Sequence, residues 1–430
     1  MRVLCVAKFP PIVGGVSTTC FWSVVEACKH GHEVCLVTNA GEAPYGYRQF
    51  LFEGDSELIS TSVGGLQVYS TTELLADSYT PWANPFASKL FGLAYSAAEN
   101  FIPDLIVGWY FEPYGIVAAL LGRFLDVPVY LIHAGSDIGK LAHHPNLHAA
   151  YHVAASMADG LLTNNIPSIL ESVRVLGVPD SKIILSEYSA LPSVYRSTAG
   201  GFDMDFLSAA SAKWFEQYPV SVAMLSRLRA INLKSLKAGE FTICVYGKVG
   251  KAKASFEILD ALNDVLQLGR RFNFITVPAG DPITLNAYFE HLFSNDNLVE
   301  HTWLLPPIAP WRIPQLLKLT DAAFSLEYPA DIEFHASRIA REILASGTTL
   351  ICSHESIDRN HLGKHLFDRI NAVVVEPPRA RGLHRRLIEL IDNRDACTAI
   401  GRQGKRLSNF LEGFADGRMP LSQLADLLRK

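Results

Sequence analysis

Two successive series of short apolar segments, rich in β-branched residues, constrain the fold of this chain more than any other feature. Stretches with helical spacing fill most of the gaps between these segments, and this alternation predicts parallel sheets crossed by helices. The first series is RVLCVA from Arg2, EVCLVT from Glu33, LIVGW from Leu105, VPVYLIH from Val127, GLLTNN from Gly160 and KIILSEY from Lys182. The second is FTICVYGK from Phe241, FNFITVPAG from Phe272, LVEHTWLL from Leu298, AAFSLEY from Ala322, TTLICS from Thr348 and AVVVEPP from Ala372. The sequence therefore predicts two successive units of the same α/β architecture.

The length of the chain and the positions of the two series define the expected domains. A chain of 430 residues can form two or three domains of about 150 residues, or two of about 200. We expect Rossmann-like parallel-sheet domains at 1–195 and 241–405 that face one another across a cleft, an inter-domain connection at 196–240 and a helical tail at 406–430. Because such sheets bind ligands beyond the carboxyl ends of their strands, functional motifs should directly follow strands.

The charge and the cysteine content exclude several classes of protein. The 38 basic and 43 acidic residues give a net charge of −5, so the chain lacks the polycationic surface that favours nucleic acids. Its seven cysteines form no Cys-x2-Cys pair, and most lie in apolar runs, which predicts reduced core thiols. A hydrophobic content of 49% excludes a disordered or fibrous chain.

The sequence shows no sign of secretion or membrane insertion. Met1 and Arg2 lead directly into a strand-like segment, without the basic region and cleavage site of a signal peptide. No apolar run reaches the ~18 to 20 residues of a membrane span. We therefore expect a soluble, cytoplasmic protein. The basic stretch 379–395 is interpreted as a solvated helix face, and peripheral contact with an anionic membrane is the alternative.

The first motif is FPPIVGGVSTTCFW, residues 9–22, between the first predicted strand and a predicted helix at Ser17–His30. Gly14 and Gly15 let backbone amides approach a ligand and expose the amino terminus of this helix to an anion. The segment is not the G-x-G-x-x-G dinucleotide fingerprint, which disfavours a dehydrogenase. A tight turn without a ligand is the alternative.

The second motif is YGKVGKAKASFEILDALN, residues 246–263, which follows the first strand of the second series. Lys248 and Lys253 lie at a strand-to-helix turn, where two ammonium groups and the helix dipole can converge on a diphosphate. The turn lacks the Gly-Lys-Ser/Thr ending of a P-loop, which disfavours ATP hydrolysis. A solvated basic turn is the alternative. No Asp-x-Asp-like pair accompanies the lysines, so we expect no metal.

The third motif occupies residues 327–353, where a strand ends in an acidic loop and a helix follows at about 336–346, before Gly347. Glu342 lies within this helix, at the edge of the expected cleft, where a carboxylate can accept hydrogen bonds from two ribose hydroxyls. A surface ion pair between Arg338 and Glu342, worth little energy, is the alternative.

Two further clusters have weaker interpretations. The aromatic segment 109–114 follows the strand LIVGW, where it can recognise an acceptor or simply pack. Four histidines include a pair at helical spacing, but no cysteine or acidic partner accompanies them, so a solvated or acceptor-side helix is favoured over a metal site. These histidines are His143, His144, His148 and His152.

Taken together, these spacings resemble the glycosyltransferases of the GT-B fold, in the large retaining family 4 group. The resemblance extends over nearly the whole chain. Its motifs are the Pro-Pro-x-x-Gly-Gly-Val loop, Gly31 to Val34, Gly247-Lys248 with Lys253, Val277 to Pro282, Thr320 to Ala323 and Glu342 to Gly347. Each motif is weak alone, but their common order is specific.

The resemblance implies roles for individual residues. Gly14 and Gly15 would face the phosphates of a nucleotide-sugar donor, with the acceptor nearby. Lys248 and Lys253 would neutralise the diphosphate leaving group, which removes the need for a metal. Glu342 would hold the ribose. His133, in HAGSDIGK, resembles the family histidine that contacts the donor sugar.

The chain departs from the family pattern at the sugar. The family usually has a glutamate eight residues before the one that matches Glu342, but Phe334 occupies this position. Glu333 and His335 flank it, and we expect either of them to serve the sugar after a shift of the loop; a changed donor preference is the alternative. Ala254 replaces the glycine that normally follows the second lysine.

These features predict an enzyme that transfers a sugar from a nucleoside-diphosphate sugar to a hydroxyl of a saccharide, a lipid-linked saccharide or a small molecule. Retention is expected, and the nucleotide sugar is a co-substrate, so no further cofactor is predicted. A sugar-nucleotide epimerase on the same fold would require paired acid and base groups instead of an acceptor pocket. A non-catalytic sugar-nucleotide-binding protein is the third hypothesis, suggested by Phe334.

Overall fold

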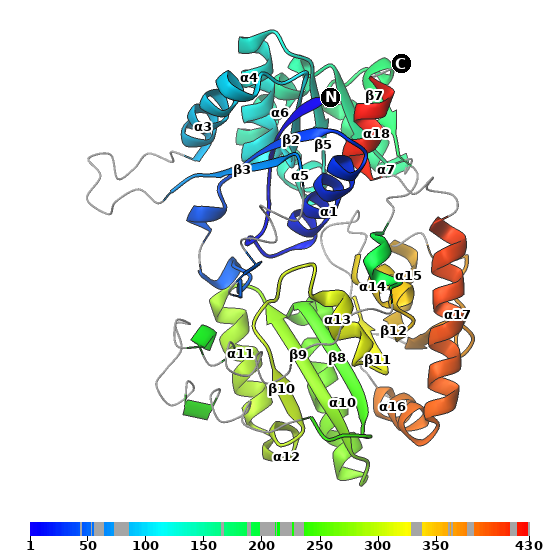
Figure 1. The fold of residues 1–430 in the computed structure, drawn as a ribbon. Helices are drawn as coiled ribbons and strands as arrows, with labels where there is room; N and C mark the ends of the chain where they lie inside the picture. Colours follow the sequence, from blue (N-terminus) through cyan, green and yellow to red (C-terminus); the bar gives the residue numbers. More distant parts are fainter. Residues whose placement is uncertain are drawn as a thin grey trace.

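The computed structural model contains two parallel sheets, one in each half of the chain (Figure 1). It describes residues 1–43, 45–52, 54–55, 64–72, 86–164, 167–186, 191–197, 211, 213–215, 226–227, 236–327, 338–359, 362, 364–375, 382–412 and 419–428. The described strands pair in parallel throughout both sheets, as the alternation of strand-like and helical segments predicts.

In the described residues, the N-terminal sheet has seven strands in the order β3-β2-β1-β4-β5-β6-β7. The strands are β1 (Arg2–Ala7), β2 (Glu33–Thr38), β3 (Leu66–Ser70), β4 (Leu105–Trp109), β5 (Val129–Ile132), β6 (Gly160–Thr163) and β7 (Ile183–Leu185). The helices of this half are α1 (Gly15–Lys29), α3 (Phe86–Phe101), α4 (Ile116–Leu125), α5 (Ser136–Gly139), α6 (Pro145–Met157) and α7 (Pro167–Val175), with a π-helical turn at Phe111–Gly115.

The C-terminal sheet has six described strands in the order β10-β9-β8-β11-β12-β13. The strands are β8 (Phe241–Lys248), β9 (Phe272–Ala279), β10 (Thr302–Leu304), β11 (Ala322–Ser325), β12 (Thr349–Ser353) and β13 (Val373–Val375). The helices are α10 (Ser255–Gln267), α11 (Pro282–Phe293), α12 (Asp296–Val299), α13 (Ile313–Lys318), α14 (Arg338–Ser346), α15 (His354–Arg359), α16 (Leu383–Asp392), α17 (Arg394–Glu412) and α18 (Pro420–Leu427).

Several predicted elements coincide with those of the structure, and others differ. β1, β2, β4 and β8 have the predicted bounds. α1 begins two residues before the predicted Ser17, because Gly14 takes a φ of 132° as its N-cap and Gly15 is already helical. The predicted strand from Leu298 was wrong at its start, since Leu298 is buried within α12. β3 was missed because Leu66 is its only fully buried residue, so it lacks an apolar run.

The central strands form the core because both of their faces are covered. All residues of β1 from Val3 to Ala7 are 0% exposed. Helices pack on both sides of each sheet, which is why these strands appear in the sequence as continuous apolar runs (Figure 1). All seven cysteines are free thiols, and only Cys28 among them is not fully buried.

The two halves also contact one another through segments distant in sequence. The Phe50 amide donates to the Pro307 carbonyl at 2.7 Å. Asp55, which is 0% exposed, forms an ion pair with Arg312 of the C-terminal half at 2.7 Å. At the end of the chain, α17 runs through the expected domain boundary at residue 405. α18 then packs beside α1, where the Leu421 amide donates to Ser23 Oγ (Figure 1).

Among the described residues, no helix combines the length and the apolar character needed to cross a membrane.

Candidate functional site

The strand orders place one topological switch point at the carboxyl ends of the central strands of each sheet. In the N-terminal sheet, the connections run in opposite directions on either side of the pair β1 and β4. In the C-terminal sheet, they do so on either side of β8 and β11. The loops diverge at such switch points, and ligands of doubly wound sheets bind there, beyond the carboxyl ends of the strands. The predicted motifs follow β1, β5, β8 and β11, so they lie at or near these two switch points.

Gly14 and Gly15 lie between β1 and α1, as predicted. The φ of 132° at Gly14 is a conformation that residues with a side chain rarely adopt. A Cβ atom at either glycine would have no neighbour within 4 Å, so the space beside the start of the helix is open. α1 has no side-chain cap, which leaves the amides of its first turn free to meet an anion.

His133 follows β5 and has a defined orientation. Its Nε2 shares a hydrogen bond of 2.6 Å with Thr163 Oγ1, while its buried Nδ1 has no hydrogen-bond partner among the described residues. Burial lowers the pKa of His133, and the nearby Asp137 carboxylate opposes this shift only in part. The imidazole is therefore neutral at neutral pH, with one nitrogen free to bind a ligand hydroxyl.

Asp137 organises the loops around His133. It is 0% exposed, and its Oδ1 accepts hydrogen bonds from the Ala134 and Ile138 amides, both at 3.0 Å. Its Oδ2 accepts from the Phe111 amide at 3.1 Å. The carboxylate therefore joins the loop after β4 to the loop after β5. Sequence analysis did not identify Asp137, although it lies four residues after His133.

Lys248 and Lys253 lie at the C-terminal switch point, as predicted. Lys248 is the last residue of β8 and is exposed. Lys253 ends the 3-10 turn Lys251–Lys253 and forms an ion pair with Glu327, which is 2% exposed and follows β11. Sequence analysis missed this partner, although Glu327 lies only two residues after the last residue of its strand.

Glu342 lies in α14, but both of its carboxylate oxygens contact other side chains of the protein. Its Oε1 accepts from Arg338 Nε at 2.9 Å, and its Oε2 accepts from the Tyr246 hydroxyl at 3.1 Å. The ion pair with Arg338 is buried, so the alternative of a surface pair was wrong about its location. Burial and the Glu342 carboxylate raise the pKa of Tyr246, which stays a protonated donor.

The Glu342 network also reaches the N-terminal half. Arg338 Nη1 donates to Thr19 Oγ1 of α1 at 3.2 Å. Tyr195 lies beside the same groups, and its pKa is raised by burial and by the Glu342 carboxylate. Glu342 is therefore part of a buried polar contact between α14 and α1.

The predicted sugar-binding residues Glu333 and His335 lie in 328–337, outside the described residues, as does Phe334. Their roles stay predictions.

The weaker clusters are mostly structural. Phe111 and Tyr114 are buried in the N-terminal core, so most of the aromatic segment packs. His144 caps α6, and His148 and His152 form hydrogen bonds with backbone carbonyls. Tyr110 is different, because its φ of 77° is uncommon for a residue with a side chain and its ring faces Lys8.

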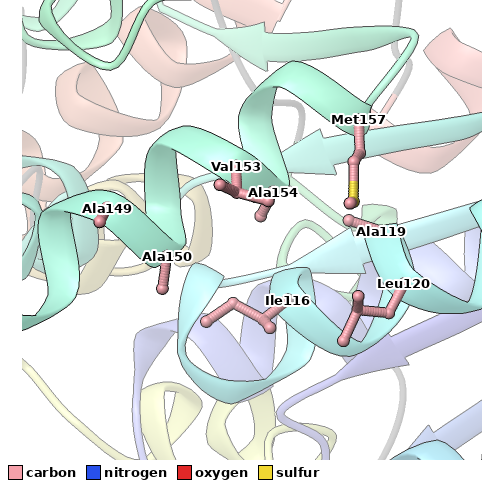
Figure 2. A pocket seen from close by; sticks show the side chains of 8 residues that line it. All are labelled: Ile116, Ala119, Leu120, Ala149, Ala150, Val153, Ala154 and Met157. Carbon is pink, nitrogen blue, oxygen red and sulfur yellow. The ribbon is translucent and has the colours of Figure 1, made fainter.

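A separate hollow of about 320 Å³ lies between α4 and α6 (Figure 2). Its lining is Ile116, Ala119, Leu120, Ala149, Ala150, Val153, Ala154 and Met157. None of these side chains can form a hydrogen bond that would orient a polar substrate. The switch points, which do offer such groups, are therefore the better candidate site.

Comparison with known proteins supports the fold assignment. No family model matches the sequence, and no curated protein matches it. Among solved structures, Anabaena HepE in complex with UDP-glucose is 16% identical, with a TM-score of 0.61 over 100% of this chain and 99% of HepE. Sucrose-phosphate synthase from Thermosynechococcus elongatus is 14% identical, with a TM-score of 0.59 over 100% and 98%.

A third similar structure is the UDP-GlcNAc 2-epimerase of Neisseria meningitidis bound to UDP-GlcNAc. It is 13% identical, with a TM-score of 0.56 over 100% of both chains. At these identities the similarity concerns the fold alone. The chain has the GT-B fold, with two Rossmann-like domains, which confirms the predicted fold class.

Proposed function

We propose that this protein is a glycosyltransferase that moves a sugar from a nucleoside-diphosphate donor to a hydroxyl acceptor, with retention and without a metal. One observation carries the proposal. Lys248 and Lys253 lie at the switch point of one GT-B domain, and the open start of α1 and the neutral His133 lie at the carboxyl edge of the other sheet. This combination suits a diphosphate and a sugar held between the domains.

The chemistry requires stabilisation of a leaving group. The bond between the anomeric carbon and the phosphate oxygen breaks, and its electron pair stays on the nucleoside diphosphate. An acceptor oxygen forms the new bond on the same face of the sugar, and the acceptor proton passes to the departing phosphate. Fixed ammonium groups and helix amides stabilise the charge that develops on the phosphate. His133 would bind a sugar hydroxyl through Nδ1.

More of the described residues suit the donor than the acceptor. In the similar structures, HepE holds UDP-glucose and the Neisseria epimerase holds UDP-GlcNAc. We propose a nucleoside-diphosphate sugar as donor here. For the acceptor, we propose a saccharide, a lipid-linked saccharide or a small-molecule hydroxyl near the loops after β4 and β5.

A sugar-nucleotide epimerase is the second candidate, because the Neisseria epimerase shares the fold. Incubating the protein with a panel of sugar nucleotides, with and without mono- and disaccharide acceptors, distinguishes the candidates. Release of nucleoside diphosphate that depends on acceptor supports the transferase. Interconversion of sugar nucleotides without acceptor supports the epimerase. Tight binding without turnover contradicts both and supports a binding protein.

The panel is first screened by thermal denaturation. A ligand at about 100 times its dissociation constant stabilises the folded state by ~2.7 kcal/mol, which shifts the melting temperature measurably. If no sugar nucleotide or nucleoside diphosphate stabilises the protein, the donor class proposed here is wrong.

A further inference from the structure

Lys8 lies at the switch point of the N-terminal sheet and was not identified by sequence analysis. It follows Ala7, the last residue of β1, and Tyr110 follows Trp109, the last residue of the neighbouring β4. The Lys8 ammonium lies 4.1 Å from the centre of the Tyr110 ring. The Tyr110 hydroxyl in turn contacts Ser136 Oγ at 3.1 Å. These contacts therefore hold the Lys8 side chain beyond the ends of the strands.

Lys8 is half-buried, and no carboxylate forms an ion pair with it in the part of the chain that the structure describes. Asp137 is the acidic group that acts on it, but this carboxylate already accepts three backbone hydrogen bonds. The ring of Tyr110 compensates only part of the lost hydration of the ammonium group. A partly buried cation of this kind favours an anionic ligand.

A second lysine, Lys248, lies at the corresponding strand end of the other domain, and its charge acts on Lys8. Lys248 is the last residue of β8. β8 lies beside the switch point of the C-terminal sheet, as β1 lies beside the switch point of the N-terminal sheet. Burial and the Lys248 ammonium lower the pKa of Lys8, and together they outweigh the opposing effect of Asp137. The two like charges repel one another, and an anion between them would convert this repulsion into two attractions.

We propose that Lys8 and Lys248 bind one anionic group from opposite sides of the cleft. This proposal rests on the proposed function and extends it, because it adds a ligand from the N-terminal domain to the lysines of the C-terminal domain. The anion has two chemical sources. It is the diphosphate of the donor, or it is a phosphate or carboxylate on the acceptor.

The test compares Lys8→Met with wild type by calorimetry, using inorganic pyrophosphate, UDP and uridine as probes. Methionine keeps an apolar contact with Tyr110 but removes the charge. Lys8→Gln is the second variant in case Lys8→Met does not fold, and Lys8→Arg should restore binding. Lys29→Met is the matched control, because Lys29 is an exposed lysine at the end of α1. Thermal denaturation verifies that each variant is folded.

If the donor diphosphate is the anion, Lys8→Met weakens pyrophosphate and UDP by about tenfold to a hundredfold, and uridine is unaffected. The dependence of UDP affinity on salt concentration also decreases, which loss of packing alone would not cause. If the acceptor carries the anion, UDP affinity is unchanged, but binding of inorganic phosphate to the UDP-saturated protein is lost. Both results support an anion site at Lys8.

Unchanged affinity of Lys8→Met for pyrophosphate, for UDP and for phosphate in the presence of UDP would overturn the proposal. Failure of the proposed function gives a different result, in which the wild-type protein binds no nucleoside diphosphate when UDP, GDP and ADP are tried. Titration with pyrophosphate and phosphate still tests Lys8 in that case.

Discussion

Lys253, which ends the turn after β8, forms an ion pair with Glu327, a residue after β11 that is only 2% exposed. This pair spans the switch point of the C-terminal sheet and fixes the position of the lysine. Lys248 is exposed and forms no ion pair with any described residue. Sequence analysis predicts the same role for both lysines, but in the structure only Lys253, of these two, compensates the buried charge of Glu327.

This difference predicts that substitution of the two lysines has similar effects on activity but different effects on the stability of the protein. Lys248→Ala and Lys253→Ala should each lower kcat by about a hundredfold to a thousandfold, because each removes a charge from the departing diphosphate. Only Lys253→Ala should destabilise the protein, by about 3 kcal/mol, since it removes the ammonium group that forms an ion pair with the buried Glu327 carboxylate. Sugar-transfer assays and urea denaturation of both variants measure the two effects.

The double variant Lys253→Ala/Glu327→Gln provides the control. Neutralising Glu327 should restore most of the stability without restoring transfer. A stable, folded double variant with near-normal transfer would show that Lys253 has a structural role alone.

His133 should make stability depend on pH in a defined direction. Its pKa in the folded protein is lowered from the ordinary 6.5 by burial. Below pH 6.5 the histidine of the unfolded chain takes up a proton while the folded protein keeps His133 neutral. The contribution of His133 to the free energy of unfolding is therefore fully present above pH 6.5 and is lost as the pH falls. We expect the melting temperature to fall less between pH 7.5 and about 5.5 in His133→Gln than in wild type. An equal fall in both proteins would contradict this assignment.

Activity should not require a divalent metal. Lys248, Lys253 and the amides at the start of α1 supply positive charge at the proposed phosphate site. EDTA should therefore leave the transfer rate unchanged. Loss of activity in EDTA that magnesium or manganese restores would require a different account of the leaving group.

The central strands and the positions of the motifs could be predicted from sequence because burial on both faces produces an apolar run. Glu33–Thr38 and Phe241–Lys248 illustrate this, whereas β3 exposes most of its residues and gives no such signal. The partners of the site residues could not be predicted. Lys253 meets Glu327 across 74 residues, and Tyr246 meets Glu342 across 96. Neither separation corresponds to the spacing of neighbours within a helix or a strand. Such pairs therefore form only when the sheet brings distant segments together.

The last prediction concerns the division of roles between Glu342 and the loop before α14. Glu342 already accepts hydrogen bonds from Arg338 and Tyr246, but a carboxylate offers about four acceptor sites. If the remaining sites hold the ribose, Glu342→Gln should weaken both the bare nucleoside diphosphate and the intact sugar nucleotide by about tenfold to a hundredfold. Calorimetric titration with both ligands measures this.

Glu333→Ala and His335→Ala should behave differently, because these residues flank the position at which the glycosyltransferases that the sequence resembles usually have a glutamate, which we expect to lie at the sugar. Each should weaken the intact sugar nucleotide more than the bare nucleoside diphosphate. Tyr246→Phe is the control for the network around Glu342, since it removes one hydrogen bond and leaves the carboxylate. If Glu342→Gln lowers the melting temperature but leaves both affinities unchanged, Glu342 serves the contact between α14 and α1 alone. Equal losses for both ligands in all three variants would show that neither Glu333 nor His335 distinguishes the sugar.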